Sequence, residues 1–160
     1  MMMTGLEPRG FTWVISNRLA VSERIGGYGF QHRRVRREEE IIWLKNAGIT
    51  AILSLLEGNQ NIAAYEAAGI RAFNEPLVEL DPETVRRVFR AMSKIGSKAG
   101  TVLLVHRDII DDTVAGVLAG YLVHSGRVSD PIVATALVQE ILKRPLGPEA
   151  RAIIPLSTGA

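Results

Sequence analysis

The chain has 160 residues, of which 47% are hydrophobic and 22% charged, and its formal net charge is +2. This length and composition predict one globular domain over residues 1–160, with flexible tails at 1–10 and 156–160, and exclude a membrane-spanning or fibrous protein. The absence of cysteine excludes disulfides, thiolate metal sites and a thiol nucleophile. The N-terminus has no basic region followed by an apolar core, so we expect no secretory signal and a cytoplasmic location.

The first half of the chain predicts short strands and two helices. Residues 11–22 alternate apolar and polar side chains, which favours one or two strands, and a glycine-rich loop follows. A helix is expected over 37–48, with Glu38–Glu40 in its first turn, where the helix dipole favours negative charge. The apolar run 49–57 predicts a buried strand, and 61–69 predicts a short helix.

The second half predicts further strands at 70–79 and 101–106, alternating with helices. Capping residues, prolines and glycine stops indicate helices at 81–100, 112–126, 129–144 and, for about one turn, 148–153. The small residues of the helix at 112–126 are expected to let it pack close to the sheet. The alternation predicts an α/β fold with a mainly parallel central sheet of four to five strands and helices on both faces. Ligands bind such sheets beyond the carboxyl ends of the strands, so a site is expected after Val105.

Several segments, in matching order and spacing, resemble one family. Its opening strands, glycine loop and helix–strand turn are similar to WVISNRLAVSERIGGYG and EEEIIWLKNAGITAILSLLE. Its general-acid segment is similar to IRAFNEPLVELDPETV, and its phosphate-loop signature aligns without gaps with VHRDIIDDTVAGVLAGYL. An Arg-Pro turn near its C-terminus is similar to LKRPLGPEA. The family is the protein tyrosine phosphatase superfamily, above all the small dual-specificity phosphatases of bacteria and archaea, and the resemblance over 11–155 implies their fold.

The same resemblance implies that the chemistry has been lost. In this family a cysteine attacks phosphorus, backbone N–H groups and an arginine bind the phosphate, and an acid on another loop protonates the leaving group. Here the signature positions are degenerate: His106 before the nucleophile position, Arg107 at it, Ile110 for the loop glycine and Thr113 for the arginine. The vestigial acid position is Glu79 or, by a small shift, Asp81. We therefore expect a pseudophosphatase, a binding or regulatory module without catalytic residues or cofactors.

The acidic loop after Val105 has two interpretations. The first is helix capping by Asp111 or Asp112, with His106 hydrogen-bonded to nearby backbone and no metal. Arg107 would then pair with Asp108, Asp111 or Glu79 and lock the loop closed. The alternative is a hard-metal site of a metal-dependent phosphoesterase, built from His106, Asp108, Asp111 and Asp112.

Four arginines form the strongest basic cluster of the chain: Arg33, Arg34, Arg36 and Arg37. We interpret them as a solvated helix start that pairs with Glu38–Glu40. The alternative is a non-hydrolysing phospholigand sensor, in which they and Arg107 bind an anion. The expected partner is a protein or a phosphorylated small ligand, without a membrane, and the chain is expected to be a monomer or homodimer. Nucleic acid is disfavoured because few aromatic residues accompany the arginines.

Overall fold

The computed structural model describes residues 5–28, 33–58 and 61–158. In this part of the chain a five-stranded sheet has the order β1–β2–β5–β3–β4. Its strands are β1 Thr12–Ile15, β2 Leu19–Ser22, β3 Ala51–Ser54, β4 Arg71–Asn74 and β5 Leu103–His106. The β1–β2 pair is antiparallel and the other three pairs are parallel. The predicted α/β class and mainly parallel sheet are confirmed.

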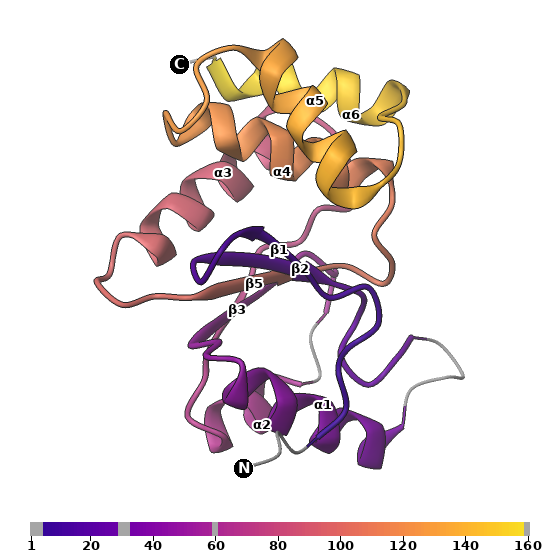
Figure 1. The fold of residues 1–160 in the computed structure, drawn as a ribbon, viewed down its shortest axis with the longest axis vertical. Coiled ribbons are helices and arrows are strands. Elements are labelled where there is room, and N and C mark those ends of the chain that lie inside the picture. The colour runs from indigo at the N-terminus through magenta and orange to yellow at the C-terminus, as the bar shows by residue number, and fades with distance from the viewer. Residues whose placement is uncertain (1–4, 29–32, 59–60, 159–160) are drawn as a thin grey trace.

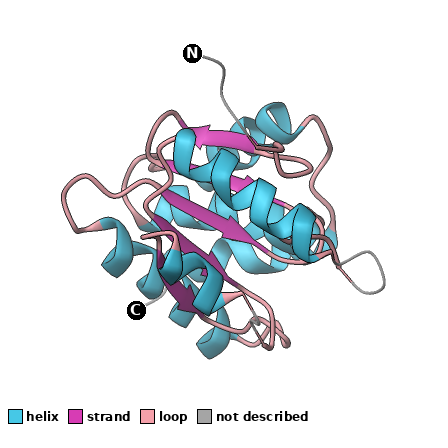
Figure 2. Ribbon diagram, turned by 90° about the horizontal axis from the view of Figure 1, so that it is seen from below, coloured by secondary structure: helices cyan, strands magenta, loops and turns pink. Residues whose placement is uncertain are grey.

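Helices cover both faces of this sheet (Figures 1 and 2). One face carries α1 and α2, and the other carries α3 to α6 (Figure 1). Their bounds are α1 Arg34–Asn46, α2 Ile62–Ala67, α3 Pro82–Gly96, α4 Asp112–His124, α5 Pro131–Leu142 and α6 Pro148–Ile153, followed by the 3-10 helix η2 Ile154–Thr158. No helix in the described ranges is long and apolar enough to cross a membrane.

Strand β5 lies at the centre of the sheet, and all four of its residues are buried. Leu103 and Val105 pack into the core beneath α3 and α4, whereas Leu104 packs into the second core with Leu44 of α1 and Tyr65 of α2. A strand that is covered on both faces needs apolar side chains on both, which explains the continuous apolar run of its sequence.

The predicted helix over 37–48 is wrong at its start, because α1 begins at Arg34. Its first turn therefore carries arginines, and the glutamates lie one turn later. Two pairs four residues apart compensate for the unfavourable dipole: Arg34 Nε lies 3.1 Å from Glu38 Oε1, and Arg36 Nε lies 2.7 Å from Glu40 Oε2. Glu40 is only 1% exposed and also accepts a hydrogen bond from the Gly26 N–H at 2.7 Å, which fixes the glycine-rich loop to the helix.

The tails expected at 1–10 and 156–160 fall partly outside the described residues, which leave out 1–4 and 159–160. In the described N-terminal part, the Leu6 N–H donates to the Glu39 carbonyl of α1 at 3.0 Å. Near the other end, Arg86 Nε donates to the Leu156 carbonyl at 3.3 Å. Both ends of the described chain are thus hydrogen-bonded to the domain.

Candidate functional site

The loop between β5 and α4 lies at the carboxyl edge of the sheet, where the sequence places the site. Backbone and side-chain contacts tie this loop to two distant segments. The Arg24 N–H donates to the Asp108 carbonyl at 3.2 Å, and Arg24 Nη1 lies 3.6 Å from the Asp108 carboxylate. Arg144 Nη1 donates to the Ile110 carbonyl at 3.1 Å. The loop is therefore held from the glycine-rich loop on one side and from the segment after α5 on the other.

Arg107 forms the central contact of the loop. Its Nη1 lies 3.3 Å from Asp111 Oδ2, and its Nη2 donates to the Leu77 carbonyl at 3.1 Å. The expected pairing with Asp111 is confirmed, whereas Asp108 pairs with Arg24 and Glu79 is exposed. Because Leu77 belongs to the segment that resembles a general-acid loop, the guanidinium joins the two loops that would carry nucleophile and acid in the family.

Asp111 and Asp112 both cap helices, but different ones. Asp111 Oδ1 accepts the Val114 N–H at 3.0 Å and caps α4, as predicted. The Asp112 oxygens accept the Gly147 N–H, just before α6, at 2.6 Å and the Ala150 N–H, in its first turn, at 2.9 Å. Partial burial tends to raise the pKa of Asp112, but the hydrogen bonds from these N–H groups hold it below its usual value. The sequence did not predict that Asp112 caps a helix so far along the chain.

Replacing Asp112 by alanine is expected to lower the free energy of unfolding by about 2 kcal/mol, because the two N–H groups lose a charged acceptor. The matched control is Asp130→Ala, which removes an exposed cap bonded only to the Ile132 N–H and should cost about 1 kcal/mol. Urea unfolding followed by circular dichroism measures both. Equal losses in the two variants would contradict the role assigned to Asp112.

His106 is 1% exposed, and its Nδ1 lies 3.1 Å from the Arg107 carbonyl, so the expected bond to nearby backbone is confirmed. Since a carbonyl only accepts, Nδ1 carries the proton, and Nε2 has no hydrogen-bond partner among the described residues. Burial lowers the pKa of His106 to about 4, and the ring is neutral at physiological pH.

The residues of the alternative metal site are not brought together. His106 points into the core, while the loop aspartates contact Arg24, the start of α4 and the start of α6. Within the described ranges, no three His, Asp or Glu side chains gather in a way that could hold a metal ion. The geometry therefore does not favour the metal-dependent phosphoesterase.

The arginines of the cluster bond to residues of α1 and of neighbouring segments. Besides the two pairs with glutamates, Arg37 Nη1 lies 3.4 Å from Asn61 Oδ1, and the Arg33 N–H donates to the Gly26 carbonyl at 2.9 Å. The predicted pairing with Glu38–Glu40 is confirmed for Arg34 and Arg36. Because these arginines bond within the fold, no observation favours the phospholigand sensor built on them. Phe30, one of the few aromatics near them, lies outside the described residues.

A pocket of about 310 Å³ opens beside the loop, lined by Tyr28, Leu56, Arg107, Asp108, Ile109 and Asp111. Two carboxylates and one guanidinium face it, so its charge does not favour a phosphate dianion. Sequence reasoning missed Tyr28 and Leu56 as pocket residues. The only available signal was that each follows a strand at this edge of the sheet.

No family model matches the chain, and no curated protein sequence matches it either. Solved structures do match. The kinase-associated phosphatase, with serine in place of its catalytic cysteine, is 15% identical, with a TM-score of 0.72 over 96% of this chain and 98% of that one. Tk-PTP in its active form is 14% identical, with a TM-score of 0.72 over 94% and 98%. Human DUSP28 is 18% identical, with a TM-score of 0.64 over 94% of each chain.

The chain has the protein tyrosine phosphatase fold. Its neighbours include phosphatases of the dual-specificity type, so the resemblance expected from the sequence is confirmed at the level of the fold. At an identity of 14–18%, these structures show a shared fold but not a shared activity. The site must therefore be argued from its own residues.

Proposed function

We propose that this chain is a catalytically inactive phosphatase-fold module, a cytoplasmic pseudophosphatase that acts by binding a protein partner or a phosphorylated small ligand. The observation that carries the proposal is the contact of Arg107, at the nucleophile position, with both Asp111 and the Leu77 carbonyl. An arginine stays protonated and has no electron pair with which to attack phosphorus. Since the chain has no cysteine, no neighbouring residue supplies a thiolate.

The groups that bind phosphate in the family are also replaced. At the start of α4 the Val114 N–H already donates to the Asp111 carboxylate, so an incoming phosphate dianion would meet a like charge. Thr113 is neutral and only 7% exposed, and it cannot substitute for the charge of an arginine. The Ile110 carbonyl is held by Arg144, which fixes the loop in its present shape. Charge and shape both support a loop that does not bind a substrate phosphate.

Pure protein is expected to hydrolyse neither p-nitrophenyl phosphate nor a phosphotyrosine peptide above the buffer rate, with or without added Mg²⁺ or Mn²⁺. Asp111→Ala removes the carboxylate from the start of α4 but leaves Arg107 in place, so this variant is also expected to be inactive. Turnover by the wild-type protein that disappears in Arg107→Ala would refute the proposal, because the activity would then belong to this loop. Turnover that is equal in both proteins points to a contaminating phosphatase.

The pocket beside Arg107 is the surface through which we expect the module to bind a protein partner. Tyr28 and Ile109, at its rim, are 37% and 43% exposed, and exposed apolar side chains around a cavity are typical of binding surfaces. The Arg107 bridge keeps the two flanking loops together, so the pocket is formed before a partner arrives. This rigidity supports a binding role for the scaffold.

A further inference from the structure

Two adjoining cavities lie at the amino end of β5, the edge of the sheet opposite to the loop after His106. They are bounded by the β1–β2 turn, the 97–102 segment and the start of the α4–α5 connection. The inner cavity has about 30 Å³ and the outer one about 510 Å³, and both are lined by Arg18, Gly96 and Thr101. They therefore form one continuous depression, here called the double cavity.

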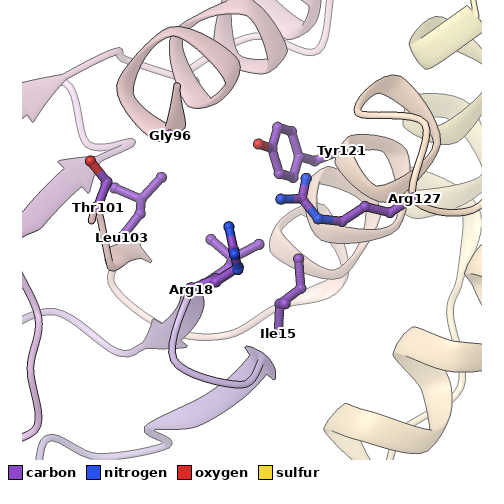
Figure 3. Close-up of a pocket in the computed structure, with 8 residues that line it drawn as sticks. Ile15, Arg18, Gly96, Thr101, Leu103, Tyr121 and Arg127 are labelled. Atoms are coloured by element: carbon purple, nitrogen blue, oxygen red, sulfur yellow. The ribbon is translucent and has the colours of Figure 1, made fainter. Parts of the chain in front are cut away.

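The charged residues that line the double cavity are all basic: Arg18, Lys98 and Arg127. No aspartate or glutamate lines either part, and the ion pairs of the described residues include none of these three cations. The side chains of Arg18 and Arg127 point toward the same space, one from the strand side and the other from the helix side (Figure 3). Like charges that converge without a counter-charge repel each other, so the site favours an anion.

The neutral polar groups of the inner cavity are donors as well. Thr101 Oγ1 accepts a hydrogen bond from Arg71 Nη2 at 2.8 Å, which leaves its own proton to donate. Tyr121 is 7% exposed, and its hydroxyl has no hydrogen bond to another described residue. Tyr121 lines the inner cavity, so its hydroxyl is free to donate to a ligand or to water there. Guanidinium and hydroxyl donors together match the oxygens of a phosphate group.

We propose that the double cavity binds a small phosphorylated molecule. The phosphate lies between Arg18 and Arg127 at the inner cavity, which is too small for an organic body. The outer cavity, whose volume is that of an ordinary ligand pocket, holds the rest of the molecule beside Lys98. This proposal does not depend on the loss of catalysis, because its residues lie at the other edge of the sheet from the loop after β5.

The test is a titration of the full chain with inorganic phosphate and with glucose 6-phosphate, followed by calorimetry and amide NMR. We expect both to bind, glucose 6-phosphate the tighter, with the largest shifts at Gly96, Gly100 and Thr101. Arg18→Ala and Arg127→Ala should each weaken binding by about tenfold or more. The control Arg34→Ala removes an arginine that is 82% exposed and does not line the cavity, and it should bind as the wild type does.

Three results would overturn the proposal: no binding of either compound at about 10 mM, unchanged affinity in both cavity variants, or shifts confined to residues 107–114. Equal affinity for the two compounds would overturn the role given to the outer cavity. Arg18 and Arg127 are exposed, and their variants should keep the wild-type melting temperature to within about 2 °C, which separates a binding defect from a folding defect.

Discussion

Gly116→Ala is expected to destabilise the protein by about 3 kcal/mol, although alanine normally stabilises a helix relative to glycine. Gly116 lies in α4 where that helix meets α6. A Cβ added there would lie 2.6 Å from Ala150 Cα, and it could be accommodated only if the backbone of α6 moved. Any such movement would also strain the bonds between Asp112 and the start of α6. The gain in helix propensity, about 1 kcal/mol, is smaller than this cost.

The matched control is Gly96→Ala, at the end of α3. A Cβ there has the Tyr121 hydroxyl as its nearest neighbour, at an ordinary 3.6 Å, so this variant should be neutral or up to about 1 kcal/mol more stable. Thermal unfolding should therefore show a fall of about 10 °C for Gly116→Ala and no fall for Gly96→Ala. If both variants melt with the wild type, α4 and α6 do not approach as closely as the structure indicates.

Local chemistry in the sequence predicted most of the elements. Asp81 and Asp130, each followed by proline, indicated helix starts, and both carboxylates accept a backbone N–H in the first turn. The apolar runs of β3 and β5 predicted buried strands because a strand covered on both faces needs apolar side chains on both. These features depend on residues a few positions apart, which a single sequence contains.

Contacts between distant segments could not be predicted in the same way. Asp112 accepts the N–H of a residue 35 positions later, just before α6, and Arg107 reaches a carbonyl 30 residues earlier. Capping preference alone left Asp111 and Asp112 as equal candidates for one helix. The small residues of α4 were expected to face the sheet, yet the close approaches of Gly116 and Gly120 are to Ala150 and Phe89, on other helices. Small size indicates close packing but does not identify the partner.

The candidate site was predicted in part. The bond of His106 to backbone, the pairing of Arg107 with Asp111 and the capping of α4 each involve residues within four positions of one another. Arg24 and Arg144, which hold the loop from outside, were not predicted, because nothing in a single sequence places them beside residues 107–111. Their contacts show that the loop is held firmly on both sides, as the proposed binding role requires.

His106 is expected to make the protein sensitive to mild acid. Its pKa is about 4 in the folded protein because burial disfavours the charged ring, and about 6.5 in the unfolded chain. Between these two pH values the unfolded state binds more protons than the folded state. The contribution of neutral His106 to the free energy of unfolding is therefore fully present above pH 6.5 and is lost as the pH falls toward 4. The free energy of unfolding should decrease by about 3 kcal/mol across this window.

The measurement is urea unfolding at a series of pH values from 7 to 4 for wild type, His106→Asn and His124→Asn. Asparagine at position 106 can still donate to the Arg107 carbonyl but does not titrate. This variant should therefore lack the decrease in the free energy of unfolding that the wild type shows at low pH. His124 is exposed, and its replacement should leave the wild-type pH dependence unchanged. The carboxylates with lowered pKa values, Asp81 and Asp112, lose their contributions only below this window, and the difference between the two variants therefore isolates His106. A wild-type pH dependence that persists in His106→Asn would show that another group causes it.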